Sequence, residues 1–242
     1  MTALWIILGV LGGLISLVIA YVLFLLLITI FVPKKEYEKV SPFYRGVLNS
    51  FLYLFLGLFR IKIKVKNRET IDKVEGRFLL VSNHRSNYDP IVTYYAFRDK
   101  GMAFISKPEN FKIPIAGKVI RKCCFLAIDR VNPRNAIRTL RKASDIIKND
   151  EVSFGIYPEG TRSKDGNMLE FHDGVFKIAQ NANVPVVVVT IKNTENIAKR
   201  KFWGKITTEI EIVDVIDSQT VSSKTTHELS AMAKESMLKN LG

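Results

Sequence analysis

Hydrophobic residues fill the beginning of the chain without interruption by charge. No side chain from Met1 to Pro33 is charged, and the first charged residue is Lys34. An apolar segment of about 20 residues or more is long enough to cross a bilayer as one helix. A signal peptide would have a basic start and a short apolar core, and this segment has neither feature. The pattern predicts a hydrophobic membrane helix over residues 3–33.

A second apolar stretch, residues 46–59, is too short to span a bilayer comfortably. It can be an ordinary core helix or a helix that lies in the membrane interface beside the first one. We favour the interfacial alternative, which makes residues 1–60 an N-terminal membrane anchor and residues 61–242 one globular domain. The positive-inside tendency places this domain in the cytoplasm, at the cell membrane. The cations that follow the first helix and support this orientation are Lys34, Lys35, Lys39 and Arg45.

Beyond the anchor, short apolar segments alternate with amphipathic ones. Ile61–Lys66 alternates strictly between apolar residues and lysine, which predicts a half-exposed strand. Short continuous apolar runs, rich in β-branched and aromatic residues, predict strands that are buried on both faces. These runs are Phe78–Ser82, Met102–Ser106, Cys123–Ile128, Val152–Tyr157 and Val184–Ile191, and a further strand near the sheet edge is expected at Ile206–Val213.

Helical patterns separate these strands. Asn132 followed by Pro133 is typical of a helix N-cap with proline at the first helical position. The residues after it place apolar side chains on one face and basic side chains on the other. Further helices are expected at residues 174–181 and 225–241. The alternation predicts a single α/β domain, in which a central, mostly parallel or mixed sheet is flanked by helices and preceded by the hydrophobic anchor helix.

The composition is strongly basic, with 36 Lys and Arg against 23 Asp and Glu and a net charge of +13. Anionic lipid headgroups, a phosphorylated or acidic ligand, or nucleic acid could each account for this charge. Nucleic acid is excluded, because the cations are scattered, no nucleic-acid-binding motif accompanies them and the chain is anchored in a membrane. Cys123 and Cys124 are adjacent in an apolar run, so we expect buried thiols and no disulfide.

Candidate chemistry begins with His84 and Asp89, which lie just after an apolar run. A neutral imidazole can take a proton from an alcohol near pH 7, and a carboxylate on its other nitrogen fixes the tautomer. The two side chains can meet only if the backbone between them turns, which Ser86 and Asn87 favour. Pro90 is expected to keep Asp89 out of helical dihedrals. Alone the pair is a weak signal, and a zinc site is disfavoured because no second histidine or cysteine lies nearby.

Two further blocks also follow predicted strands. Asp129 and Arg130 come after the run at residues 123–128, and the sequence PEGTRS occupies residues 158–163. Because ligands bind at the carboxyl ends of strands in open α/β sheets, we expect these blocks and His84 to converge on one pocket. Arg162 can hold phosphate oxygens in pairs with its planar guanidinium group.

The blocks NH-x4-D (residues 83–89), Asp129-Arg130 and PEGTRS, in this order behind a hydrophobic anchor, resemble the glycerolipid acyltransferases. The resemblance is greatest to the 1-acylglycerol-3-phosphate (lysophosphatidate) acyltransferase family and covers about residues 76–190. It implies that His84 is the general base and Asp89 its partner. It also implies that the substrate phosphate is bound by Lys107, Arg130 and Arg162, and that the site is shaped by Asn83, Asp129, Glu159, Gly160 and Thr161. For Glu159 we expect a structural role, because a carboxylate beside a phosphate would repel it.

The same resemblance implies that the hydroxyl group of lysophosphatidic acid attacks an acyl thioester directly, at the membrane lipid surface. The co-substrate would be acyl-CoA or acyl carrier protein, with no metal and no cofactor, and the product would be phosphatidic acid for phospholipid biosynthesis. The acceptor could instead be glycerol 3-phosphate or another lysophospholipid. An alternative of another class is a catalytically silent membrane protein that binds anionic lipids, and the presence of His84, Asp89 and Arg162 argues against it.

Overall fold

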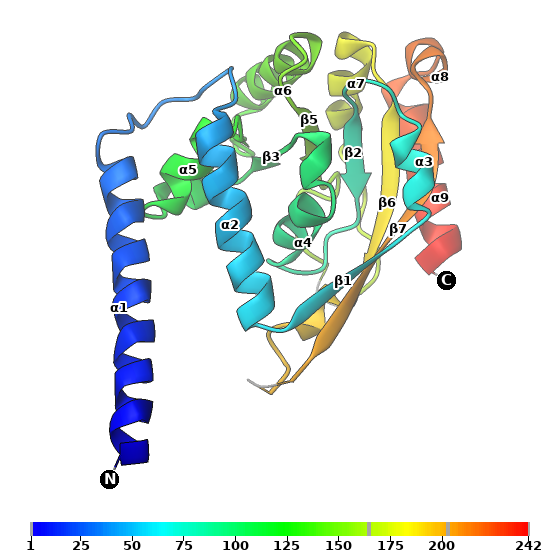
Figure 1. Ribbon diagram of the computed structural model, residues 1–242. Coiled ribbons are helices and arrows are strands. Elements are labelled where there is room, and N and C mark those ends of the chain that lie inside the picture. The colour runs from blue at the N-terminus through cyan, green and yellow to red at the C-terminus, as the bar shows by residue number, and fades with distance from the viewer. Residues whose placement is uncertain (1, 164–165, 202–203, 242) are drawn as a thin grey trace.

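The computed structural model describes residues 2–163, 166–201 and 204–241. At its centre is a seven-stranded sheet with the strand order β1-β7-β6-β2-β5-β3-β4 (Figure 1). Neighbouring strands are parallel except β6 and β7, which are antiparallel. The expected α/β domain with a mixed, mostly parallel sheet is therefore confirmed. The strands are β1 (Ile61–Lys66), β2 (Leu79–Ser82), β3 (Met102–Ser106), β4 (Leu126–Ala127), β5 (Ser153–Ile156), β6 (Val186–Lys192) and β7 (Ile206–Ile216).

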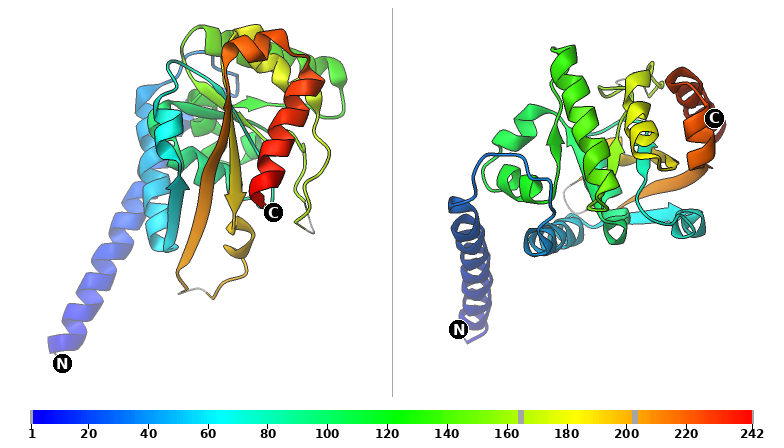
Figure 2. Two further views of the ribbon diagram at one scale, coloured as in Figure 1. Left: turned by 90° about the vertical axis from the view of Figure 1, so that its right-hand side faces the viewer. Right: turned by 90° about the horizontal axis from the view of Figure 1, so that it is seen from above.

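Helices cover both faces of the sheet. α6, α7 and α9 lie on one face, and α2 and α4 lie on the other (Figure 2). The α-helices are α1 (Thr2–Ile30), α2 (Pro42–Leu58), α3 (Arg68–Asp72), α4 (Asp89–Ala96), α5 (Ala116–Lys122), α6 (Pro133–Lys148), α7 (Lys177–Ala182), α8 (Ser218–Ser223) and α9 (Thr226–Leu241). Short 3-10 helices are η1 (Arg98–Lys100), η2 (Pro108–Lys112), η3 (Asp173–Phe176) and η4 (Thr194–Asn196).

Helix α1 projects from the rest of the molecule, and its N-terminal end lies far from the sheet (Figure 1). Nearly all of its apolar side chains are exposed, and within the helix only Leu25 and Thr29 are buried. Among the described residues, α1 is the one helix that is long and apolar enough to cross a membrane. An exposed helix of this length and composition indicates membrane association, because its apolar surface would stay in contact with water unless a bilayer buried it.

The C-terminal end of α1 is fixed to the globular domain by polar contacts. The Tyr44 hydroxyl group donates to the Ile28 carbonyl oxygen at 2.6 Å, and the Lys118 ammonium group donates to the Thr29 carbonyl oxygen at 2.8 Å. The last carbonyl groups of a helix lack partners within the helix and carry partial negative charge, which a lysine neutralises well. Leu25 packs here against Val47 of α2 and Val119 of α5.

Helix α2 has two different apolar faces. Leu52 and Leu56 are buried in the main core, whereas Phe51, Leu54 and Leu58 are exposed on the other side. The helix begins at Pro42, four residues before the apolar stretch recognised in the sequence. It is thus a core helix on one face, and its other face presents apolar side chains in the same part of the molecule as α1 (Figure 1). The core-helix interpretation is therefore confirmed for one face, and an interfacial position of the other face stays a prediction.

One predicted strand is much shorter than expected. The sequence predicts a strand at residues 123–128, but only Leu126 and Ala127 form one. Cys123 and Cys124 instead end α5, because their N–H groups donate to carbonyl groups of that helix. A continuous apolar run has no periodicity that would separate a helix end from a strand. Both thiols are free and buried, as expected, and burial raises the pKa of each to about 12.

Most other element boundaries differ by one to three residues from those expected. Strand β7 continues to Ile216 and lies second from the edge, because β1 occupies the edge. Helix α6 begins as predicted, with the Asn132 side chain accepting hydrogen bonds from the N–H groups of Arg134 and Asn135 at 3.0 and 3.4 Å. Residues 174–181 contribute to η3 and α7. Helices α3, α4, α5 and α8 were not expected from the sequence.

The burial of α2 leads to a first prediction. Leu56→Ala should lower the free energy of unfolding by about 2–5 kcal/mol, because it removes a core side chain and leaves a cavity. Leu54→Ala, two residues earlier and on the exposed face, should change it by less than about 0.5 kcal/mol. Denaturant unfolding of both variants in detergent micelles checks this. Equal, small effects would mean that α2 is only an interfacial helix.

Candidate active site

A cavity of about 540 Å³ lies where the loops after β2, β3, β4 and β5 meet. Helix α6 forms one of its walls with Ala136 and Leu140, and a segment around η3 forms another with His172 and Val175. The four strands are parallel neighbours in the sheet, so their carboxyl ends point to the same edge. This is where ligands bind in open α/β sheets, and motifs far apart in the sequence converge here as expected.

His84 and Asp89 meet at this cavity. The Nδ1 atom of His84 lies 2.8 Å from Oδ2 of Asp89. The imidazole lines the cavity and is 15% exposed, whereas Asp89 is completely buried. The same Oδ2 accepts hydrogen bonds from the N–H groups of Arg85 and Ser86, each at 2.7 Å, and Oδ1 accepts one from the Thr194 hydroxyl group. An ionised carboxylate is an acceptor only, so Nδ1 of His84 carries the proton and Nε2 remains available as a base.

The backbone between the two residues turns, as the spacing required, but Asp89 itself is helical. It is the first residue of α4, and Pro90 lies in the first turn of that helix. The expectation that Pro90 would keep Asp89 out of helical dihedrals is therefore wrong. The preference imposed by a following proline is modest, and the hydrogen bonds of the Asp89 carboxylate outweigh it. The start of a helix also favours a negative side chain, so this position stabilises the carboxylate.

Tyr157 supports the imidazole from one side. Its ring stacks on that of His84 with centroids 4.3 Å apart and an angle of 20° between the planes. Phe104 stacks on Tyr157 in turn, at 5.9 Å and 17°. Burial, reinforced by the negative charge of Asp89, raises the pKa of the Tyr157 hydroxyl group well above its usual value, so Tyr157 stays neutral. The imidazole is thus fixed by a carboxylate at its edge and by an aromatic ring on its face.

Glu159 holds the backbone around the histidine. It is 3% exposed, and its carboxylate accepts hydrogen bonds from the N–H groups of His84 at 2.6 Å and of Leu169 at 2.9 Å. Burial raises the pKa of this carboxyl group, against the opposing effect of these hydrogen bonds. The Ser163 N–H group donates to the His84 carbonyl oxygen at 2.9 Å. The PEGTRS loop is therefore attached to both backbone groups of His84.

The three expected phosphate ligands all reach the cavity. Lys107, Arg130 and Arg162 line it from the loops after β3, β4 and β5, and all three are exposed. Gly160 and Thr161 line it as well. A cavity with an oriented histidine on its wall and three cations around it suits an anionic substrate that carries a hydroxyl group.

Asn83 and Asp129 act on the backbone instead of lining the cavity. Asn83 exchanges two hydrogen bonds with the backbone of Ile191, at 3.0 and 2.8 Å, and so fixes the end of β2 to β6. Asp129 accepts hydrogen bonds from the N–H groups of Val131 and Asn132 and from the Asn135 side chain, which lower its pKa. It therefore shapes the loop that carries Arg130 into α6.

Comparison with known proteins shows the family of this chain. The model of the Acyltransferase family matches residues 62–192. A probable 1-acyl-sn-glycerol-3-phosphate acyltransferase of Mycoplasma pneumoniae is 32% identical over 74% of this chain and 69% of its own length. The chain belongs to the 1-acyl-sn-glycerol-3-phosphate acyltransferase family. The enzyme of this name from Haemophilus influenzae is 28% identical to this acyltransferase over 78% of the chain and 77% of the relative.

A solved structure supports the same assignment. The crystal structure of the 1-acyl-sn-glycerophosphate (LPA) acyltransferase PlsC from Thermotoga maritima has a TM-score of 0.67 and 28% sequence identity. The match covers 81% of this chain and 78% of that one. The shared fold therefore includes most of the sheet and its helices, and extends well beyond the motifs themselves.

Three residues of this acyltransferase site were not assigned from the sequence. They are Tyr157, Thr194 and His172. Thr194 comes from η4, between β6 and β7, and contacts Asp89 across 105 positions of sequence. No spacing rule could have revealed such a partner. His172 lies beside Gly160, whose φ is +67°, and a Cβ atom on Gly160 would come within 2.8 Å of the His172 ring. Proximity in the fold is the only signal that identifies it.

The close contact of Gly160 gives a second prediction. Gly160→Ala should lower acyl-transfer activity strongly, because the new methyl group displaces the His172 ring within the cavity. Gly166→Ala is the matched control, since Gly166 also has a positive φ but open space around it. Each variant should lose about 1–2 kcal/mol of stability from backbone strain. Parallel activity and unfolding measurements separate the effects. Equal losses of activity would show that strain alone, and no contact with His172, explains them.

Proposed function

We propose that this chain transfers a fatty acyl group from an acyl thioester to the sn-2 hydroxyl group of 1-acylglycerol 3-phosphate, which forms phosphatidic acid. The observation that carries the proposal is the 2.8 Å hydrogen bond between His84 and Asp89 at a cavity that Lys107, Arg130 and Arg162 also line. The names of the relatives specify the same acceptor and acyl transfer to it.

In the proposed reaction, Nε2 of His84 takes the proton from the sn-2 hydroxyl group. The oxygen attacks the thioester carbonyl carbon, and the carbon–sulfur bond breaks as the tetrahedral intermediate collapses. The imidazolium then returns its proton to the leaving thiolate, so that histidine ends the cycle neutral. Asp89 stabilises the imidazolium that forms in between, and Thr194 and Tyr157 are positioning residues that hold the pair in place. The attacking hydroxyl group belongs to the substrate, so no acyl-enzyme intermediate is needed.

The cations provide the proposed phosphate subsite. A phosphate monoester carries close to two negative charges, and Lys107, Arg130 and Arg162 come from three different loops around one cavity. An arginine can hold two phosphate oxygens at once, whereas lysine acts as a single charge. Binding the phosphate orients the glycerol backbone and brings one particular hydroxyl group to His84. The apolar wall offers room for the reacting acyl chain, and it includes Ile105, Ile128, Leu140, Ile156 and Val175.

The proposed location is the cytoplasmic face of the cell membrane. Helix α1 supplies the apolar anchor, and α2, which carries exposed apolar residues, lies beside it (Figure 1). Lys34, Lys35 and Lys39 are exposed in the segment that follows α1, which fits the positive-inside tendency. Arg45 has a different task, because its guanidinium group donates to the Met102 carbonyl oxygen at 3.3 Å inside the domain. A substrate that is itself a lipid could then enter the cavity without leaving the membrane.

The base assignment gives a third prediction. His84→Ala should lower kcat by about 10²–10⁴-fold, because the hydroxyl proton loses its acceptor. The control is His227→Ala, which removes another histidine with an aspartate partner, Asp173 at 2.9 Å, on the surface of the domain. That variant should keep wild-type turnover. Phosphatidic acid formation from labelled 1-acylglycerol 3-phosphate is measured, with thermal unfolding as the test of folding. Near-normal turnover of folded His84→Ala would show that His84 is not the general base.

The phosphate assignment gives a fourth prediction. Arg162→Ala should raise the acceptor KM about 10–100-fold, because a charge-assisted hydrogen bond contributes roughly 1.5–3 kcal/mol. Arg162→Lys should restore only part of the affinity, since lysine lacks the paired donors. The KM values for 1-acylglycerol 3-phosphate and for the uncharged 1-acylglycerol are compared. If both acceptors were affected equally, Arg162 would not contact the phosphate.

A further inference from the structure

The outer face of α6 carries a row of cations. Arg134, Arg138, Arg141 and Lys148 are all exposed. At about 100° per residue, these positions fall within roughly 80° of arc on the helix. Asp145 is the one acid within the same row. We call the four cations the α6 basic face. They extend over roughly 20 Å, at about 1.5 Å per residue.

The charges of the α6 basic face are not used inside the molecule. In the part of the chain that the structure describes, none of its four cations forms an ion pair with an acid. Lys142, on another side of the same helix, is different, because it pairs with Glu36 at 3.0 Å and Glu38 at 3.2 Å. Unpaired like charges along one helix face repel each other, so an acidic partner would be stabilising.

Apolar side chains accompany these cations. Val131, just before α6, is 93% exposed, and Ile137 is 51% exposed next to the row of cations. Arginine is enriched at surfaces that bind another protein, whereas lysine and glutamate are depleted there. This combination of arginines and exposed apolar side chains favours a folded protein over a small anion as the binding partner.

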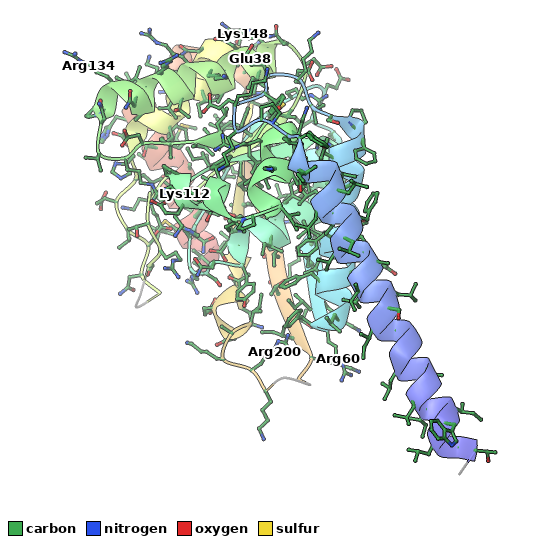
Figure 3. The ribbon with its side chains drawn as sticks, turned by 90° about the vertical axis from the view of Figure 1, so that its left-hand side faces the viewer. Glu38, Arg60, Lys112, Arg134, Lys148 and Arg200 are labelled. Atoms are coloured by element: carbon green, nitrogen blue, oxygen red, sulfur yellow. The ribbon has the colours of Figure 1, made fainter. Side chains whose placement is uncertain are left out.

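The α6 basic face adjoins the catalytic cavity and lies away from the membrane anchor. Ala136 and Leu140, on the inner side of α6, line that cavity. One helix diameter, about 10 Å, separates the inner side from the outer one. Arg134 and Lys148 lie at the upper edge of the molecule, whereas α1 runs down toward its N-terminus at the opposite end (Figure 3). When α1 is in a membrane, the α6 basic face is therefore open to the aqueous phase.

We propose that the α6 basic face docks an acidic acyl carrier protein, which delivers the acyl thioester on its flexible prosthetic arm into the cavity beside α6. This inference rests on the proposed function and specifies its donor. The inference rests on the complementary charges of the α6 basic face and an acidic carrier protein, and on the exposed apolar residues beside that face. A nucleotide such as that of coenzyme A has its phosphates close together and would contact only part of a face roughly 20 Å long. An anionic membrane is disfavoured because the face points away from the α1 end.

The test compares two donors that carry the same palmitoyl group, one on acyl carrier protein and one on coenzyme A. The variant R134E/R138E/R141E reverses three charges of the α6 basic face on the full-length protein in membranes. With carrier-bound donor, kcat/KM should fall at least tenfold at low ionic strength, because complementary charges speed association. With the coenzyme A thioester it should stay within twofold. Salt at about 0.5 M should weaken the wild-type preference for the carrier, as the charges are screened.

Two further variants control for charge and for folding. K62E/K64E/K73E reverses three exposed cations far from α6 in the fold and should leave the ratio between the two donors unchanged. D145K removes the one acid within the row and should raise kcat/KM about twofold or more for the carrier-bound donor only. This variant adds a favourable charge, so loss of folding cannot produce the expected result.

Each contrary outcome has a distinct meaning. The docking proposal is overturned if the α6 reversal lowers kcat/KM equally for both donors or only for the coenzyme A thioester. It is also overturned if the wild type uses only the coenzyme A thioester. The last result would still establish acyl transfer, so the proposed function would stand. If the wild type transferred nothing from either donor, the proposed function would fail. Fluorescence anisotropy of labelled carrier protein would then test docking alone, and loss of binding in the α6 reversal variant would support it.

Discussion

A carboxylate buried away from water needs hydrogen-bond donors around it, and Asp89 has four. They are the imidazole of His84, the N–H groups of Arg85 and Ser86, and the hydroxyl group of Thr194. An unpaired buried charge would cost several kcal/mol, so the surrounding backbone must adopt the arrangement that supplies these donors. The loop after β2, the start of α4 and the β6–β7 connection are therefore fixed relative to one another. The catalytic geometry and the stability of this region have the same cause.

The rest of the site is connected to this carboxylate through His84. Its backbone is bonded to the PEGTRS loop at both the N–H and the carbonyl group, by Glu159 and Ser163. The loop in turn carries Arg162, so the distance between the proposed base and the proposed phosphate subsite is set by a short chain of direct contacts. The membrane anchor is connected to the site through α5. Lys118 of α5 binds the end of α1, and α5 leads through Cys123 and Cys124 to β4, after which Arg130 follows.

These connections explain what could be predicted from the sequence. The spacing of His84 and Asp89, with turn-forming residues between them, allowed the two to be paired, but this was a weak signal until the family resemblance supported it. Arg130 and Arg162 could be brought together because each follows a strand of one parallel sheet. Lys107 was assigned only from the family resemblance. Local sequence patterns could not predict the contact of Thr194 with Asp89, which are 105 residues apart. Nor could they predict the stacking of Tyr157 on His84, which are 73 residues apart. The end of α5 at Cys123 was missed for a different reason, since an unbroken apolar run fits helix and strand equally.

The molecule also shows that a histidine–aspartate contact does not by itself make an active site. His227 and Asp173 lie 2.9 Å apart, nearly as close as His84 and Asp89 at 2.8 Å. The His227 side chain is 85% exposed, however, and water can replace its partner at little cost. In the cavity the aspartate is fully buried, the imidazole is stacked on Tyr157, and Lys107, Arg130 and Arg162 line the same cavity. Low exposure fixes the orientation of His84, and the cations are proposed to bind its substrate. The chemistry therefore resides in the surroundings of the pair more than in the pair.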